Sequence, residues 1–518
     1  MVYLNVIYRM GANTAPFNHY HGDMAKRSGA ITPVITLDRS SVQPLHSQIY
    51  RAFRDAIARG DLRAGQRVPS SRAMSVELNV SRIPVLGAYA QLEAEGYFQT
   101  RKGAGTFVSS ALPESLTQCR QPVTRRTPKA SGPRPVARRA LLSLTEPRSP
   151  WHAGLGAFCV HQPAFDEFPF AIWSRLVTHH SKNPNARAIH CVDPLGTRRF
   201  REAICDYLRT ARAVRAEPEQ IMIVSGSQQA LQIAANVLLD PGDSVWMEEP
   251  GYRLARNVFA AAGCHVIPVQ VDNEGLNVTA GIKQCPDARV ACVTPSHQYP
   301  LGSTMSAARR LQLLNWAQLH GAWIIEDDYD SEYRFESTPI SSLQGLDSNS
   351  RVIYIGTFSK VLFASLRMGY MVIPQDLVER FIAVRFTMDI FPPYLYQEVI
   401  ADFMREGYFA RHIRRMRLLY SNRRKALVEQ LRSGFGHTFE IHGAEAGMHL
   451  AATFRSDRDD VAVAEKAAEQ GLWLWPLSKN YVTRNVRKGF VLGYGNVSAQ
   501  MMPGAIAKLR SALSRASS

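Results

Sequence analysis

The stretch RVIYIGTFSKVLFASLRMGYMVI, residues 351–373, places one lysine between two apolar runs that are rich in β-branched residues. Lys360 follows the strand-like run VIYI, and Arg367 lies seven positions further on. An amine at the end of a buried strand is desolvated, which favours the neutral, nucleophilic form that condenses with an aldehyde. Thr357, Ser359 and Arg367 offer hydroxyls and a guanidinium to a phosphate. The alternative, a solvated lysine in a loop, is commoner for an isolated Ser-Lys pair.

A second segment, AWIIEDDYDSEY at residues 322–333, has the period of a β-strand. Asp327 and Tyr329 fall on one face of that strand, so a carboxylate and a phenol are expected side by side at its end. A carboxylate that faces a pyridine nitrogen keeps the ring protonated, and a phenol can bond a ring hydroxyl. The acidic run could instead bind a divalent metal through oxygen ligands. No histidine or further carboxylate cluster lies nearby in the sequence, so we expect no metal.

Three further segments fit the same site. The segment IMIVSGSQQALQIAANVLL, residues 221–239, predicts a strand, a Gly-Ser turn and a helix whose N-terminus, at Ser227 and Gln228, can hold an anion. Tyr252, after a Pro-Gly turn, offers a flat face to an aromatic cofactor. The loop TPSHQYPLG, residues 294–302, offers polar side chains to a ring oxygen. Each pattern is common in α/β proteins by itself, but together they predict one cofactor site.

These motifs carry a resemblance: residues of about 150 to 515 resemble the fold-type I aminotransferases, which bind pyridoxal 5'-phosphate. The resemblance implies that Lys360 is the Schiff-base lysine and that Asp327 faces the pyridine nitrogen. It also implies that Tyr329 lies at the 3-hydroxyl and that Tyr252 stacks on the ring. The phosphate cup that it implies consists of Ser227, Gln228, Thr357, Ser359 and Arg367.

One departure from that family concerns the substrate. Its arginine for a substrate carboxylate lies on a C-terminal strand, and the corresponding strand here, FVLGYG at residues 490–495, has no arginine. Amino-acid binding is therefore less well supported than cofactor binding. The remaining candidates for a carboxylate contact are Arg253, Arg256, Arg484 and Arg487.

The positive charge of the chain is concentrated near its N-terminus. The formal net charge is +17, and residues 1–143 hold 20 basic against 8 acidic residues, compared with 41 against 36 in the remaining 375. Such asymmetry indicates a polyanionic partner. We expect nucleic acid rather than a membrane, because the sequence has no amphipathic basic helix and no apolar run of membrane-spanning length.

Residues 44–109 predict how nucleic acid is bound. PLHSQIYRAFRDAIARG has an apolar stripe at helical spacing, and VPSSRAMSVELNV predicts a short second helix that is capped by Ser70 or Ser71. A third helix is expected after a cap at Ser81. YFQTRKGAGTFVS, residues 97–109, predicts two short strands joined by a basic turn. This order of elements is that of a winged helix-turn-helix.

The segment resembles the winged helix of GntR-type regulators, through PSSRAMSVELNVSRIPV and EAEGYFQTRKGAGTFV. In this geometry the third helix presents its N-terminus to the major groove, the second helix meets phosphates and the wing reaches an adjacent groove. Any single arginine here could belong to a solvated basic surface that binds no DNA. That alternative does not account for the ordered series of helices, caps and basic turn. The expected DNA contacts are Ser71, Arg72, Ser81, Arg82, Lys102 and Gly103. Ile83 and Pro84 replace a Thr-Thr pair that is common when such a domain is fused to an aminotransferase-like one, which leaves the base preference open.

The remaining segments complete the expected organisation. Residues 1–33 are expected to be a disordered leader, or to precede a start at Met24, and they do not resemble a signal peptide. The winged helix-turn-helix spans 34–109, and a linker rich in Pro, Arg and Ser spans 110–143. The cofactor domain spans 144–518, with a small subdomain over about 395–518. The seven cysteines have no CxxC spacing, which fits a reducing, cytoplasmic location.

From about residue 40 to 515 the chain is similar to MocR-type transcription regulators, in which a GntR winged helix precedes an aminotransferase-like domain. The resemblance implies an α/β fold, with a mostly parallel sheet, helices on both faces and a small C-terminal α+β subdomain. It further implies a homodimer, domain-swapped head-to-tail, that binds a double-stranded DNA operator of amino-acid, amine or vitamin B6 metabolism genes. The effector would be pyridoxal phosphate or its adduct with a small amine or amino acid.

Two alternatives differ in what the cofactor does. In the first, the chain is an active aminotransferase with an accessory DNA-binding domain, because Lys360, once released from an imine, can serve as a general base. The attached DNA-binding domain argues against that alternative, and so does the absence of an arginine from the strand at residues 490–495. Weak transaminase activity is nevertheless compatible with the motifs. In the second, pyridoxal phosphate is a structural fixture and another small amine is the effector.

Overall fold

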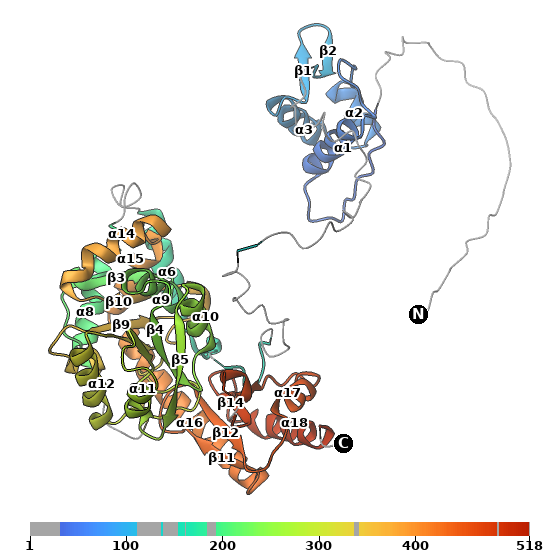
Figure 1. Ribbon diagram of the computed structural model, residues 1–518. Helices are drawn as coiled ribbons and strands as arrows, with labels where there is room; N and C mark the ends of the chain where they lie inside the picture. Colours follow the sequence, from blue (N-terminus) through green and yellow to red (C-terminus); the bar gives the residue numbers. More distant parts are fainter. Residues whose placement is uncertain are drawn as a thin grey trace. The chain divides into compact units, whose positions relative to one another are not determined.

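The structure is a computed structural model that describes residues 32–110, 136–137, 154–160, 162–183, 193–335, 341–483 and 486–516. The chain divides into two compact units between Pro135 and Val136 (Figure 1). Nearly all of the expected leader and linker lies outside the described residues. Within these ranges, no helix combines the length and the apolar character needed to cross a membrane.

The first unit is a winged helix-turn-helix. Its elements are α1 (Leu45–Arg59), α2 (Ser71–Glu77), α3 (Arg82–Ala94), β1 (Phe98–Arg101) and β2 (Gly105–Val108). The apolar face of α1 is buried against α3. The rings of Phe53, Tyr89 and Phe98 meet edge to face at centroid distances of 5.2–5.5 Å. The two strands pair antiparallel. The predicted order of elements is confirmed.

The starts of α2 and α3 differ in how they are capped. Ser70, the first of the two candidate caps, accepts a hydrogen bond from the Ala73 N–H and begins α2. Ser81 holds the N-cap position of α3, but its side chain makes no capping hydrogen bond. Its hydroxyl is exposed to solvent instead.

The second unit is built on one large sheet and one small sheet. Its strands are β3 (Ile221–Val224), β4 (Ser244–Glu249), β5 (His265–Asp272), β6 (Gly275–Leu276), β7 (Val290–Val293), β8 (Trp323–Asp328), β9 (Val352–Thr357), β10 (Gly369–Val372), β11 (Phe439–His442), β12 (His449–Phe454), β13 (Trp475–Pro476) and β14 (Gly489–Gly493). Its helices are α6 (Phe170–Lys182), α8 (Arg198–Arg212), α9 (Ser227–Leu238), α10 (Arg253–Ala261), α11 (Val278–Gln284), α12 (Ala307–His320), α13 (Leu343–Leu346), α14 (Val378–Met388), α15 (Tyr394–Arg405), α16 (Tyr408–Phe435), α17 (Asp460–Ala468) and α18 (Met502–Arg515).

The large sheet is mostly parallel, as expected. Its strand order is β3-β10-β9-β8-β7-β4-β5-β6, and the pairs from β9 through β8, β7 and β4 to β5 are parallel. Strand β10 runs antiparallel to both of its neighbours, β3 and β9. Strands β3, β4, β7, β8 and β9 therefore all end at the same edge of the sheet. Ligands of open α/β sheets bind outside such an edge.

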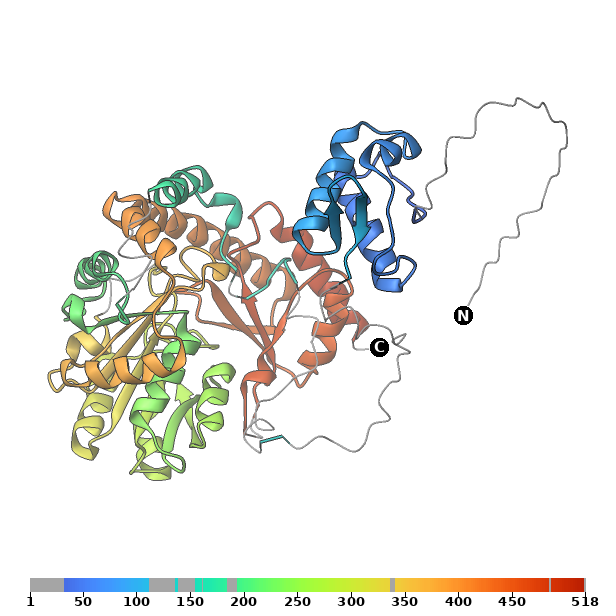
Figure 2. The same ribbon diagram turned by 90° about the horizontal axis from the view of Figure 1, so that it is seen from above.

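Helices cover both faces of this sheet, which explains why strands such as β3 (IMIV) and β7 (VACV) are apolar and buried along their whole length. In β3, Met222 and Val224 face a cluster with α9, α10 and α14, whereas Ile221 and Ile223 face a cluster with α8 and α15. Further along the sheet, Ile324 packs on the side of α11 and α12. Figure 2 shows the sheet between these helical layers.

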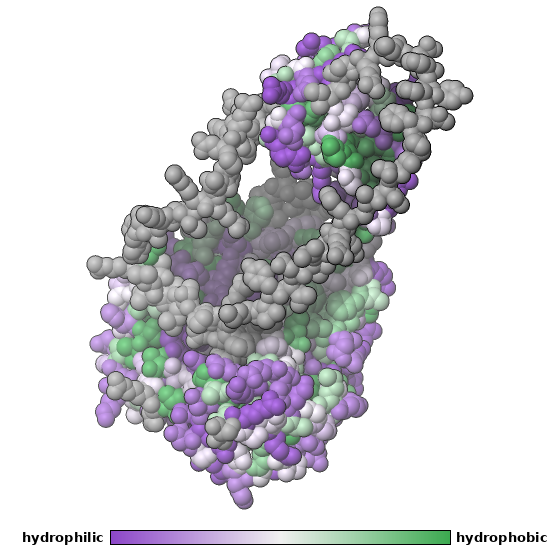
Figure 3. Space-filling model, turned by 90° about the vertical axis from the view of Figure 1, so that its right-hand side faces the viewer, coloured by the Kyte–Doolittle hydropathy of each residue, from purple (hydrophilic) through white to green (hydrophobic). Residues whose placement is uncertain are grey.

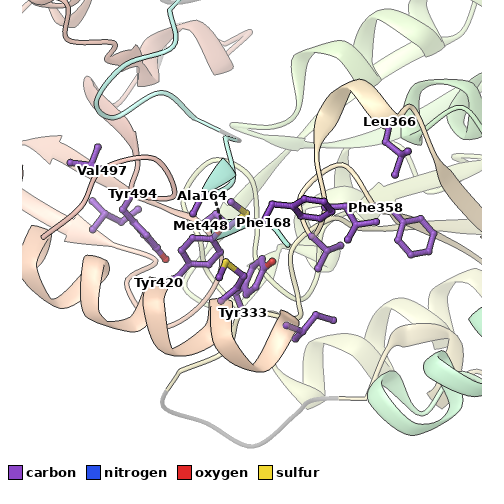
Figure 4. Packing of buried hydrophobic residues seen from close by; sticks show 14 of the residues in the cluster. Ala164, Phe168, Tyr333, Phe358, Leu366, Tyr420, Met448, Tyr494 and Val497 are labelled. Carbon is purple, nitrogen blue, oxygen red and sulfur yellow. Dashed lines mark hydrogen bonds between the residues drawn. The ribbon is translucent and has the colours of Figure 1, made fainter. Parts of the chain in front are cut away.

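The C-terminal subdomain contains the antiparallel sheet β11-β12-β14-β13 and the helices α17 and α18. The long helix α16 joins it to the large sheet, and aromatic residues fill the space between them (Figure 4). The rings of Tyr333 and Tyr420 meet edge to face at 4.8 Å between centroids, and the Tyr420 hydroxyl accepts a hydrogen bond from the Ala164 N–H. The Tyr494 hydroxyl donates to the Gly447 carbonyl at 2.7 Å.

Candidate functional site

A cavity of about 210 Å³ lies where β3, β4, β7, β8 and β9 end. Its described lining consists of Ser227, Gln228, Tyr252, Leu254, Thr294, Tyr299, Asp327, Tyr329, Thr357, Ser359, Lys360, Ala364 and Arg367. All nine residues that the sequence assigns to cofactor binding are among these. They come from four of the segments that the sequence analysis singles out, and their individual roles stay predictions.

One end of the cavity is suited to an anion. Gly226, with a φ of 97°, turns the chain into α9, so that Ser227 is the first residue of the helix. A Cβ at Gly226 would lie 3.3 Å from the Arg367 guanidinium, which shows how closely Arg367 approaches this helix start. The Thr357 hydroxyl accepts a hydrogen bond from the Ser359 N–H at 3.1 Å. A helix N-terminus beside a guanidinium and hydroxyls is a phosphate cradle.

The opposite part of the cavity is suited to a protonated pyridine. Asp327 is buried at the end of β8, and within the described part of the chain its Oδ1 has no hydrogen-bond partner. Burial, reinforced by the neighbouring Asp328, raises the pKa of Asp327 to about 7. A pyridinium N–H would supply the missing donor and stabilise the carboxylate. The donor set therefore fits pyridoxal phosphate.

The aromatic side chains of the cavity are held in place by their neighbours. The Gln228 amide donates to the Tyr252 hydroxyl at 3.4 Å, and the rings of Tyr252 and Tyr299 meet edge to face at 5.9 Å between centroids. The Tyr329 hydroxyl donates to the His297 carbonyl at 2.8 Å. Tyr252 is thus oriented by a residue of α9, and Tyr329 by the loop after β7.

Lys360 lies three residues after β9, at the wall of the cavity. Burial lowers its pKa to about 8, although Asp330 and Asp327 act in the opposite direction. The neutral amine is the nucleophile for an aldehyde. At neutral pH about a tenth of the Lys360 side chains would be neutral, far more than for a lysine in water.

The rate at which the cofactor-free protein captures pyridoxal phosphate should therefore rise with pH through about 8 and level off above that pH. The direction follows from the sign of the shift, because raising the pH increases the neutral fraction of Lys360. We expect capture at pH 7 to be about tenfold slower than the plateau rate. Stopped-flow absorbance from pH 6.5 to 9 measures this, and a rate independent of pH would contradict the assignment of Lys360.

A polar cluster beneath Tyr329 is not evident from the sequence. His297, Asp330 and His449 are buried and offer ligand atoms within 4.8 Å of one another, and His297 Nδ1 lies 3.1 Å from Asp330 Oδ2. No histidine lies near the acidic run in the sequence, but the fold brings two histidines to it from distant segments. The His297–Asp330 hydrogen bond orients the His297 side chain. The backbone carbonyl of the same residue accepts a hydrogen bond from the Tyr329 hydroxyl.

The candidate arginines for a ligand carboxylate are absent from the described lining of the cavity. Arg256 donates to the Asn480 carbonyl at 3.0 Å, and Arg487 lines a separate, larger cavity between the large sheet and the subdomain. Arg253 follows Tyr252 at the start of α10, and Arg484 lies outside the described residues.

The predicted DNA-contacting residues of α2 and α3 lie together on the first unit. Arg82 Nε donates to the Ser71 hydroxyl at 3.0 Å, and Arg72, Ser81 and Arg82 are exposed. Next to them Ile83 is 80% exposed. Lys102 and Gly103 form the exposed turn between β1 and β2. On the face drawn in Figure 3, the surface of this unit is mostly hydrophilic, with one group of hydrophobic side chains.

Comparisons with known proteins agree with both units. Residues 45–108 match the gntR family of bacterial regulatory proteins, and residues 179–494 match the aminotransferase class I and II family. The chain is 39% identical to the probable rhizopine catabolism regulatory protein MocR of Rhizobium meliloti, over 92% of this chain and 96% of that protein. It is 29% identical to the pyridoxine biosynthesis regulator PdxR of Corynebacterium glutamicum, over 93% and 98%. A kynurenine aminotransferase of Pyrococcus horikoshii superposes with a TM-score of 0.66 at 26% identity, over 73% of this chain and 97% of that chain.

Proposed function

Because the chain belongs to the MocR-type regulators, in which a gntR-family DNA-binding domain precedes an aminotransferase class I and II domain, we propose that it regulates genes of amino-acid, amine or vitamin B6 metabolism. Its first unit binds operator DNA, and its second unit binds pyridoxal 5'-phosphate. The signal is the cofactor itself or the cofactor joined to a small amine. The observation that carries this proposal is that the nine side chains predicted to bind the cofactor line one cavity, in a chain that also has a gntR-family domain.

The bound cofactor supplies an aldehyde that captures primary amines reversibly. Lys360 is the side chain that holds it covalently, and Asp327 keeps its ring nitrogen protonated. Ser227, Thr357 and Arg367 hold its phosphate. Gln228, Ser359, Tyr252 and Tyr329 line the same cavity and would orient the bound cofactor.

We infer that the protein acts as a homodimer in the cytoplasm, domain-swapped head-to-tail. Two winged helices would then read two half-sites of one operator, and an operator with two-fold symmetry is the geometric consequence. Sedimentation of the full chain at micromolar concentration should give twice the monomer mass of 57.8 kDa. A monomer that still binds a two-half-site operator would contradict this arrangement.

The competing function, an active aminotransferase with an accessory DNA-binding domain, is tested on the same preparation. Operator affinity is measured with and without the cofactor and a panel of amines, and keto-acid release is measured in parallel. A regulator should show ligand-dependent DNA affinity with negligible turnover. Turnover at about 1 per second or faster, with DNA affinity indifferent to every ligand, would establish the enzyme instead.

Two substitutions separate base reading from phosphate contact in the first unit. Arg82→Ala should lose about 1–3 kcal/mol of binding energy at the cognate operator and much less on random DNA, because Arg82 begins the helix that enters the major groove. Lys102→Ala should weaken both complexes alike and flatten their salt dependence. Fluorescence anisotropy at several salt concentrations measures both effects, and equal losses for the two variants on both DNAs would overturn the assignment.

A further inference from the structure

The inner part of the cofactor cavity has few groups that could hold a ligand carboxylate. Among the described lining residues, the cationic side chains are Lys360 and Arg367. Lys360 is committed to the cofactor, and Arg367 lies beside Gly226 at the phosphate end. The residues that an amine would meet around the ring are Tyr252, Leu254 and Tyr299.

The wall behind these residues is apolar. Val491 on β14 is fully buried in a cluster with Val271, Tyr299, Leu301, Ala451 and Leu477, and Tyr252 and Tyr329 pack against the same cluster. This strand is the one on which an arginine for a carboxylate was expected. Val491 instead adds a branched hydrocarbon to the buried cluster that lies behind these tyrosines, and it offers no hydrogen-bond donor.

The charges around the ring position also oppose a carboxylate. Asp327, Glu248 and Asp330 are buried, and each of the latter two raises the pKa of Asp327 through its negative charge. A second anion that entered this region would be desolvated and repelled. An ammonium group would be attracted, so the same charges favour a cationic amine as it arrives.

Among the described residues, the candidate arginines outside the lining do not change this balance. Arg256 is turned toward the Asn480 carbonyl, and Arg487 belongs to the larger cavity. Arg253 influences the Tyr299 hydroxyl electrostatically, but it is not among the described lining residues. It is therefore a control position in the test below.

We propose that the effector of this protein is a primary amine without a carboxylate, whose uncharged remainder packs against Leu254 and Tyr299, in front of the apolar cluster that contains Val491. This proposal rests on the proposed function, because it assigns the chemical class of the amine that joins the cofactor. It separates this chain from binders of α-amino acids, for which a buried carboxylate would need a cationic partner that the described lining does not provide beyond Lys360 and Arg367.

The test uses full-length protein loaded with pyridoxal phosphate and two matched ligand pairs. Tyramine is compared with L-tyrosine, and butylamine with 5-aminopentanoate, by titrating the cofactor absorbance band and by the shift in melting temperature. Each amine should bind at least about tenfold more tightly than its carboxylated partner, the difference that one unpaired buried charge produces. Equal affinities, or tighter binding of the carboxylates, would overturn the proposal.

Two substitutions test the wall itself. Val491→Arg should shift the preference toward the carboxylated partner by at least about tenfold, since it adds a donor where the wall is apolar. If Val491→Arg fails to fold, Leu254→Arg, at a position that is 46% exposed, should produce the same shift. Val482→Arg, on the surface at 56% exposure, and Arg253→Ala should leave the ratio unchanged.

The cofactor absorbance band and the ligand affinities together show whether the proposed function or only the class of amine is wrong. If the wild-type protein gives no cofactor band, the proposed function and this inference fall together. If the band forms but carboxylated ligands bind more tightly, the inference alone is wrong. A ratio that stays unchanged in folded Leu254→Arg, or that changes in Arg253→Ala, also contradicts it.

Discussion

Lys360→Ala should abolish the covalent attachment of pyridoxal phosphate, because no other lysine lines the described cavity. The wild-type protein with added cofactor is expected to absorb near ~410 to 430 nm, where a protonated imine absorbs. In Lys360→Ala this band should be replaced by the spectrum of the free aldehyde. Borohydride reduction followed by peptide mapping should label Lys360 alone in the wild type.

A matched control is available on the surface. Lys466 on α17 forms an exposed pair with Glu469 at 2.9 Å, remote from the lining of the cavity. Lys466→Ala should keep the wild-type spectrum and the wild-type label. If Lys360→Ala retains the band, or if the label appears on a different peptide, Lys360 is not the attachment site.

Asp328→Ala should be the most destabilising single substitution near the site. Asp328 Oδ2 accepts hydrogen bonds from Arg212 Nε at 2.8 Å, from the Tyr354 hydroxyl at 2.6 Å and from the Ser331 hydroxyl at 2.9 Å. Arg212 and Asp328 are 5% and 1% exposed. Removing the carboxylate leaves a buried guanidinium without its ion pair, which costs about 3–5 kcal/mol.

Urea unfolding followed by tryptophan fluorescence measures this loss in the second unit, because all seven tryptophans lie after residue 150. The comparison is Glu219→Ala, which breaks an exposed pair with Arg198 whose side chains are 48% and 67% exposed. That substitution should cost less than about 1 kcal/mol. Similar losses for the two variants would show that the buried network does not stabilise the fold.

The parts of the structure that the sequence predicts are those in which one short segment contains the whole pattern. The end of β8 places Asp327 and Tyr329 together because the strand has a period of two. The turn into α9 is recognisable in the sequence because a glycine precedes an apolar helical pattern. In the structure Gly226 has a φ of 97° at this turn. The winged helix follows in the same way from helical stripes and caps, although the choice between Ser70 and Ser71 as the cap needed the structure.

The parts that the sequence does not predict depend on contacts between distant segments. His297 and His449 meet Asp330 because the loop after β7 and the strand β12 converge beneath β8. Nothing local to the acidic run signals these partners. The position of Arg487 in a separate cavity depends likewise on how the subdomain packs on the large sheet. The antiparallel direction of β10 is also a tertiary property, since its sequence is apolar like that of its neighbours.

If the cofactor site controls DNA binding, the cofactor must bind the DNA-competent and the incompetent states with different affinity. The most direct measurement is the anisotropy of an operator selected from random duplexes, titrated with wild-type protein and with Lys360→Ala, each with and without pyridoxal phosphate. We expect the cofactor to change the Kd of the wild type by at least about fivefold, the lower limit of typical allosteric coupling, and to leave the Kd of Lys360→Ala unchanged. An identical Kd for the wild type with and without the cofactor, and with every amine tested, would contradict it.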